Sequence, residues 1–330
     1  MLSRTNPTII VVLVAIAILF LVPTGMTSNP YHLLVLTNIC IYIIAVSGFR
    51  LVATAGQLSM AHSAFMGIGA YTSALLVTKL GWNFWYCLLL AGMVPAILAV
   101  GLGRITLRLR GIYFAIATFA FALVIWKGWN TFFADVVGRV TDIPPPNRIG
   151  GWEFSSVTSY YYLALVLMLV TMLVMYRLDR SRFGLILRCM ASNDALSGSV
   201  GMNIMGYQIA AFAIGSFFAG MAGAVHVHWL RLMEPNMFSF TAMLYIILYA
   251  VVGGMKSFMG PLYGCFFFIG LPQFLKYIPN YDPKVEPVIF GSILLLTVRF
   301  MPGGISALLQ RISEVIKGLH RRKVKEYAAT

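Results

Sequence analysis

Residues 207–230 have the sequence YQIAAFAIGSFFAGMAGAVHVHWL, which contains no Asp, Glu, Lys or Arg. A helix needs roughly 20 apolar residues to cross a hydrocarbon core of about 30 Å. In lipid the backbone of such a run must satisfy its hydrogen bonds internally, which favours a helix. Gly215, Ala219 and Gly223 form a ladder of small residues within the run. We expect this ladder to allow close helix packing rather than to contact a solute.

The rest of the chain repeats this pattern. Hydrophobic residues make up 60% of the 330 residues and charged residues 10%, whereas a soluble domain carries about 25% charged residues. The fold class that follows is an all-α integral membrane protein with about ten transmembrane helices. Their expected limits are 8–26, 32–50, 53–78, 84–103, 111–129, 159–177, 207–231, 241–255, 260–278 and 285–302.

The first and the last of these runs are the weakest. The first, which ends at Val22, resembles a signal-peptide core, but no small-residue cleavage site follows it, so we count it as a helix. Arg299 interrupts the last run close to its end, from where its side chain can snorkel to the interface. We expect residues 1–309 to form a single transmembrane domain, followed by a basic cytoplasmic tail at 310–330.

The distribution of basic residues predicts the orientation. With the N-terminus in the cytoplasm, 17 of the 24 Lys and Arg residues fall on the inner side, as membrane proteins generally arrange them. An even number of spans then places both termini inside. The net charge of +14 has this explanation, and no aromatic–basic pattern indicates nucleic-acid binding. Two connecting segments are long: an external one at 130–158 and a cytoplasmic one at 178–206.

The cytoplasmic segment predicts two short helices along the membrane surface. Phe183, Ile186, Leu187 and Met190 have the spacing of one apolar helical stripe. A second helix begins with a cap at Asn193 or Asp194 and ends at Gly201. Small side chains on this second helix would fit closely into a partner's groove. An ordinary amphipathic loop helix would show the same pattern.

Polar residues near the start of the third run are candidates for a translocation path. Gln57 lies at its start, Gly56 and Gly67 are expected to loosen or kink it, and Ser59, His62 and Ser63 between them share one helical face. Polar groups at lipid depth face protein or water. They would therefore contact a passing solute or form hydrogen bonds between helices. We expect no catalytic residue, metal site or cofactor: His226 and His228 lie on different faces of their run, and the four cysteines form no CxxC pair.

Five blocks of the sequence, in order, resemble the branched-chain amino acid ABC-transporter permeases, and most of all their LivM-type subunit. The blocks cover residues 55–71 (AGQLSMAHSAFMGIGAY), 109–118 (LRGIYFAIAT), 181–203, 217–224 (FFAGMAGA) and 252–261 (VGGMKSFMGP). The resemblance extends from about residue 41 to 305. It implies a bacterial inner-membrane importer with a homologous second permease, two cytoplasmic ATPases and an external solute-binding protein.

The resemblance also implies roles for the segment at 181–203, which would dock on an ATPase. The implied coupling residues are Arg182, Phe183, Gly184, Arg188, Asn193, Asp194 and Gly201. The chain lacks a GxxxxGK[ST] phosphate loop, so ATP hydrolysis would come from the separate ATPases.

Three departures from the family pattern bear on the substrate. The stretch after Asn193 is poor in acids, Met243-Leu244-Tyr245 replaces a frequent Ser-x-Glu, and Val137–Asp142 replaces an external glycine-rich stretch. Branched-chain amino acids are the family's default substrates. Urea, short amides and small or aromatic carboxylates remain as alternatives with the same architecture.

Two other protein classes compete with an importer subunit. An ion-driven secondary transporter usually carries ionisable groups within the membrane, but all ten acids of this chain fall in loops, tails or span ends. A membrane enzyme would use Ser59 and His62 as nucleophile and base, but no acid close in sequence is available to orient the histidine.

Overall fold

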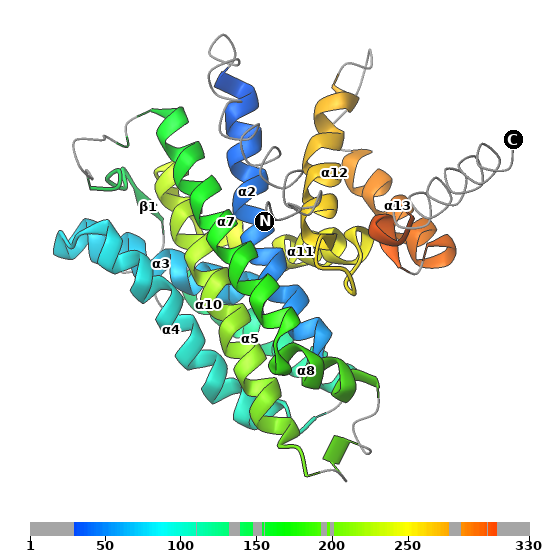
Figure 1. Ribbon diagram of the computed structural model, residues 1–330. Helices are drawn as coiled ribbons and strands as arrows, with labels where there is room; N and C mark the ends of the chain where they lie inside the picture. The colour runs from blue at the N-terminus through cyan, green and yellow to red at the C-terminus, as the bar shows by residue number, and fades with distance from the viewer. Residues whose placement is uncertain are drawn as a thin grey trace, which may run out of the picture.

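The computed structural model describes residues 30–109, 111–131, 139–147, 154, 156–192, 197–198, 201–276, 285–301 and 303–308. These residues are mostly helical (Figure 1). The long helices are α2 (Pro30–Thr54), α3 (His62–Leu80), α4 (Phe84–Thr106), α5 (Ile112–Asn130), α7 (Val157–Arg180) and α10 (Ile204–Leu230). The shorter ones are α8 (Arg182–Ser192), η1 (Pro235–Phe238), α11 (Phe240–Gly253), α12 (Gly260–Leu275) and α13 (Glu286–Phe300).

Six helical segments of the described residues are long and apolar enough to cross a membrane. They are Tyr31–Thr54, Phe84–Thr106, Ile112–Asn130, Val157–Arg180, Ile204–Leu230 and Pro235–Gly253. Each corresponds to one predicted span. The predicted spans at 260–278 and 285–302 appear as the shorter helices α12 and α13. The run at 8–26 and the tail at 310–330 lie outside the described residues. The all-helical membrane architecture is therefore confirmed, and the number ten remains a prediction.

Helix α10 packs against α2, α3 and α4 through glycines. A Cβ atom at Gly215 would lie 2.6 Å from the carbonyl oxygen of Gly48 in α2. One at Gly220 would lie 2.1 Å from the carbonyl oxygen of Ala91 in α4. One at Gly223 would lie 1.9 Å from that of Met66 in α3. Side chains are thus excluded where these backbones meet, and the interior is closely packed around them.

Helices α11 and α12 form a second close pair beside the long helices (Figure 1). A Cβ at Gly264 of α12 would lie 1.9 Å from the carbonyl oxygen of Tyr249 in α11. The turn between the two helices begins at Gly254, whose φ of +110° suits glycine. Phe268 and Phe290 then pack edge to face, with ring centroids 5.2 Å apart, and join α12 to α13.

At the end opposite α8, part of the long connection at 130–158 folds back on the helices. Strand β1 (Val140–Thr141) pairs antiparallel with β2 (Leu232–Met233), which follows α10. His228 of α10 is buried there. One ring nitrogen lies 2.9 Å from Ser73 Oγ and the other 2.9 Å from the carbonyl oxygen of Pro144. His228 therefore joins α10, α3 and the connection, which is a structural role.

Candidate functional site

A non-helical segment separates α2 from α3, within the region 53–78 that the sequence predicts as one span. Helix α2 ends at Thr54 and α3 begins only at His62. Gly56 adopts a φ of +77°, and a Cβ there would lie 3.2 Å from Cα of Ala191 in α8. The left-handed conformation turns the chain out of the helix, and a side chain at Gly56 would pack tightly against α8. The prediction of a single span that is only loosened or kinked at Gly56 was wrong at this point, because the helix is interrupted there.

The break separates the four polar residues that we expected at the start of this span. Ser59 lies in the non-helical segment, not on a face shared with His62 and Ser63, because the helix periodicity does not extend to it. Its Oγ accepts a hydrogen bond from the backbone N–H of Ala61 at 3.2 Å. Ser59 thus stabilises the turn that leads into α3.

The other three residues face different surroundings. His62 is fully buried among aromatic rings, with centroids 5.5 Å from Phe49 and 6.4 Å from Phe65. Ser63 borders a cavity of about 10 Å³ against α5 and α11, room for a single water. Gln57 is buried, and its Oε1 has no hydrogen-bond partner among the described residues. Of the four, Gln57 borders the larger cavity at the α8 end.

Helix α8 lies across the end of α7 (Figure 1). Gly184, Leu187 and Met190 are buried, and Phe183 packs on Tyr207 of α10 with ring centroids 5.8 Å apart. A Cβ at Gly184 would lie 2.5 Å from the carbonyl oxygen of Leu178. The glycine therefore lets the first turn of α8 lie directly on the last turn of α7.

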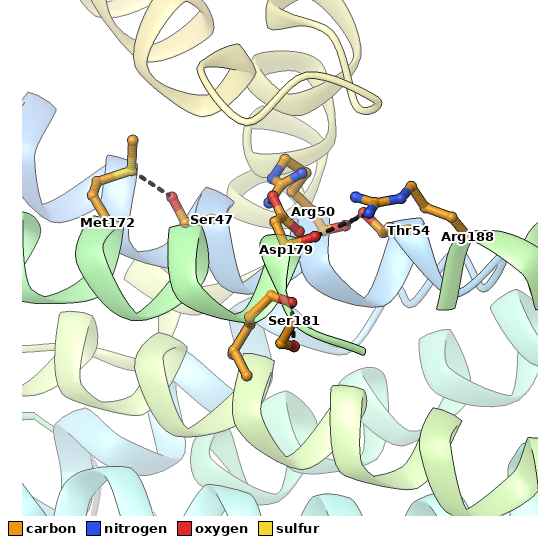
Figure 2. Close-up of polar contacts among 8 residues, drawn as sticks. Ser47, Arg50, Thr54, Met172, Asp179, Ser181 and Arg188 are labelled. Carbon is orange, nitrogen blue, oxygen red and sulfur yellow. Dashed lines mark hydrogen bonds and ion pairs between the residues drawn. The ribbon is translucent and has the colours of Figure 1, made fainter. Parts of the chain in front are cut away.

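A buried ion pair lies beside the contact between α7 and α8 (Figure 2). Arg50 of α2 donates through Nη2 to Oδ2 of Asp179 near the end of α7, and their side chains are 3% and 11% exposed. Arg188 of α8 donates through Nη2 to the backbone carbonyl of Asp179 at 3.0 Å. The guanidinium of Arg50 also lies 5.8 Å from the ring centroid of Phe258, in the turn between α11 and α12.

We call Arg50, Asp179, Arg188 and Phe258 the junction, because they join four parts of the fold at one point. Sequence reasoning missed it: Arg50 and Asp179 lie 129 residues apart. The sequence does contain one sign of this ion pair, because Asp179 is a single acid among Arg177, Arg180 and Arg182. A lone acid at the basic end of an apolar helix suggests a specific partner, but not which one.

The remaining predicted coupling residues fall into three groups. Arg182 is exposed at the start of α8. Gly201 has a φ of +81°, and its N–H donates to the carbonyl of Gly198 at 3.0 Å, which makes a turn before α10. Asn193 and Asp194, and with them most of the second predicted helix, lie outside the described residues.

These features define a class before any relative is considered. Apolar helices of spanning length, close glycine contacts and a broken helix beside a surface helix describe a multi-pass helical membrane protein. The chain belongs to the family of permease components of branched-chain amino acid transport systems, whose model matches residues 31–298.

Two relatives support this assignment. The chain is 28% identical to the high-affinity branched-chain amino acid transport system permease protein LivM of Salmonella typhimurium, over 88% of this chain and 72% of that protein. It is also 28% identical to the LivM protein of Escherichia coli strain K12, over 80% of this chain and 67% of that protein. No solved structure matches the chain. The resemblance seen in the sequence is confirmed, and both relatives are transport components rather than enzymes.

The described residues contain no group of three or more His, Cys, Asp or Glu side chains that could hold a metal ion. Among the acids of the described residues, Asp179 is the most buried, and its Oδ2 accepts a hydrogen bond from Arg50.

Proposed function

We propose that this chain is one permease subunit of an ATP-binding-cassette importer for branched-chain amino acids, and that it forms half of the translocation path. The observation that carries the proposal is the family match over 31–298. The subunit would cross a bacterial inner membrane about ten times as a single domain over 1–309, with both termini and the tail at 310–330 in the cytoplasm. Its partners would be a homologous permease, two cytoplasmic ATPases and an external solute-binding protein.

Helix α8 and the segment after it would form the surface on which an ATPase docks. Arg182, Arg188, Asn193 and Asp194 would contact the ATPase, while Phe183, Gly184 and Gly201 would hold the segment in place. The contact of α8 with α7 supports this role. Because the first turn of α8 packs directly on the last turn of α7, a displacement of α8 would act on α7. The junction adds a route from α8 to α2, and so to the break before α3.

The path itself would run beside the broken helix, with Gln57 and Ser63 next to it. Ser59 and His62 would set the shape of the break rather than touch the solute, because Ser59 bonds its own turn and His62 lies among rings. Gly215, Ala219 and Gly223 would hold α10 as the fixed helix around which the others move.

The substrate class is tested by uptake into proteoliposomes that contain the complete importer. We expect ATP-dependent accumulation of leucine, isoleucine or valine, supplied with the binding protein. Excess unlabelled valine should compete, whereas urea, acetamide and benzoate should not. Accumulation of urea or benzoate without that of leucine would transfer the proposal to the alternative substrates and leave the importer architecture in place.

Replacing Gly184 with valine should uncouple ATP hydrolysis from transport. The new side chain would collide with the carbonyl oxygen of Leu178, 2.5 Å from the Cβ position, so α8 must lift off α7. We expect the loaded binding protein to stimulate hydrolysis less, and transport to fall at least about tenfold. The matched control is Gly291→Val in α13, where a Cβ meets nothing within 4 Å. Normal transport by Gly184→Val would refute the coupling role.

The docking surface can be located through a natural cysteine. Cys189 is exposed on α8, whereas Cys40, Cys87 and Cys265 are buried. A short bis-maleimide should therefore link Cys189 to a cysteine introduced in the permease-facing groove of an ATPase. We expect the link in the assembled importer and its loss in Cys189→Ser. Failure of Cys189 to link at any groove position would place the docking surface elsewhere.

A further inference from the structure

The break, residues 55–61, lies between two cavities of very different size. At the α8 end lies a cavity of about 620 Å³, which we call the vestibule, and Gly56 and Leu58 are among the residues that line it. The second cavity, of about 10 Å³, is lined by Met60 and Ser63 together with residues of α5, η1 and α11. Because Leu58 and Met60 are only two residues apart, the break forms the wall between the two cavities.

The smaller cavity lies where α5 contacts α3, η1 and α11, a contact that we call the seam. Phe119 of α5 packs on Phe240 at the start of α11, with ring centroids 4.8 Å apart. Trp129 of α5 packs on Tyr71 of α3 with ring centroids 4.6 Å apart. The same indole covers Gly67, where a Cβ would lie 2.6 Å from it. A space of about 10 Å³ holds a single water, so the seam is closed to a solute in this structure.

Helix α5 is the least buried of the six segments of spanning length that the structure describes. Of its spanning stretch 22% is buried, against 39% to 67% for the other five. Its contacts across the seam run through side chains, and none of the close contacts between a glycine and a backbone oxygen described above involves it. Segments with few buried contacts are the ones that open at the lowest free energy. Helix α5 can therefore move with the least rearrangement of the interior.

One hydrogen bond joins α5 to the break. The backbone N–H of Met60 donates to Oγ1 of Thr118 in α5 at 3.0 Å, and Thr118 is 0% exposed. The other described hydrogen bonds of the break stay within it or go to the adjoining ends of α2 and α3. Non-helical backbone inside a membrane protein needs a partner for each buried N–H. Thr118 thus fixes the position of Met60 as long as α5 lies against α3.

We propose that α5 is the moving gate of the translocation path and that Thr118 is the positioning residue that couples it to the break. While α5 lies on α3, Thr118 holds Met60 in place and the break separates the vestibule from the seam. When α5 moves off α3, this hydrogen bond is lost, the break is released and the two cavities join. The inference rests on the proposed function for the orientation and for the existence of a path. It adds which helix moves and which contact controls it.

The test measures whether the break closes the seam to reagents from the vestibule. Ser63→Cys is a near-isosteric reporter at the seam, where Ser63 is 1% exposed. Thr54→Cys is a reporter that lines the vestibule. The complete importer is reconstituted with its ATPases facing outward, and a small membrane-impermeant methanethiosulfonate is added from that side without ATP. Mass spectrometry gives the rate of modification at each cysteine. We expect fast modification at position 54 and slow modification at position 63.

Substitutions of Thr118 then open the gate or leave it closed. Thr118→Val should raise the rate at position 63 several-fold, as expected for the loss of one hydrogen bond, whereas Thr118→Ser, which keeps the hydroxyl, should retain the slow rate. The matched control is Thr171→Val. Thr171 is also 0% exposed, and its hydroxyl donates to the carbonyl of Leu167 in its own helix at 2.8 Å, so the rate at position 63 should not change. Native Cys265 is buried and should stay unmodified in every variant, which reports an intact fold.

The movement of α5 is measured without any change at position 118. With native Thr118, the rate at position 63 should rise several-fold during turnover with ATP and the loaded binding protein. Absence of this rise in an importer that accumulates leucine would refute the movement of α5.

The remaining outcomes separate the inference from the proposed function. Equal rates at position 63 in Thr118→Val and Thr171→Val, or a fast rate at rest with native Thr118, would refute the positioning role while the importer stands. If the complex neither hydrolyses ATP nor accumulates leucine, the proposed function fails. The comparison at rest still decides in that case whether Thr118 keeps the break closed, because it needs no ATP.

Discussion

Gly223→Val is expected to prevent stable folding of this chain. A Cβ at position 223 would lie 1.9 Å from the carbonyl oxygen of Met66 and 2.8 Å from its carbonyl carbon. Both are backbone atoms of α3 and cannot rotate away. Ordinary overpacking costs about 1–3 kcal/mol, and we expect more here, because α10 and α3 must separate. The measurement is the thermal midpoint of the detergent-solubilised protein, followed by size-exclusion chromatography.

The matched control for this substitution is Gly101→Val in α4. A Cβ at Gly101 meets nothing within 4 Å, and the position is exposed. We expect the control to retain the wild-type midpoint and the wild-type yield. Equal behaviour of the two variants would show that α10 does not pack on α3 as described.

Asp179→Leu is expected to have the second largest effect. It leaves the guanidinium of Arg50 only 3% exposed and without its counter-charge, and breaking a buried ion pair in this way costs about 3–5 kcal/mol. Removing both charges in Arg50→Met/Asp179→Leu should restore most of that stability, because the desolvated charge is gone. The double-mutant cycle is measured on the same thermal midpoints.

The same double variant separates stability from transport. If the junction transmits movement from α8 to α2, the double variant should fold normally and still import slowly. Arg180→Met is the control, since Arg180 is exposed. Its guanidinium carbon lies 4.8 Å from the ring centroid of Tyr176, and such a contact contributes about 0.5–1 kcal/mol. Wild-type import by the double variant would mean that Arg50 and Asp179 contribute to stability alone.

The sequence predicted the long helices because lipid leaves an apolar run few alternatives. The runs at 84–103, 159–177 and 207–231 became α4, α7 and α10, with ends shifted by a few residues. The ladder of Gly215, Ala219 and Gly223 also pointed to close packing. It omitted Gly220 of α10, which packs against α4. A four-residue spacing describes only one face of α10, whereas the glycines of this helix meet α2, α3 and α4.

The candidate site was less accessible to sequence reasoning. The break at 55–61 contains Ala55, Leu58 and Met60, which suit a continuing helix as well as a turn. Gly56 lies in this break beside Ala191 of α8, where a Cβ would come within 3.2 Å of Cα of Ala191, and this approach across 135 positions of the chain is contained in no local pattern. The pairing of Arg50 with Asp179 is equally non-local. Such contacts follow from the packing of α8, which periodicity predicts as a helix but does not place.

The central claim is that this subunit is moved by separate ATPases, and ATP-driven uptake tests it most directly. Radiolabelled leucine is supplied with the binding protein to vesicles that contain this chain and its partner permease, with and without the two ATPases. We predict uphill accumulation only when the ATPases and ATP are both present, and none from an imposed proton gradient. Accumulation by the permeases alone, or driven by the proton gradient without ATP, would contradict the claim.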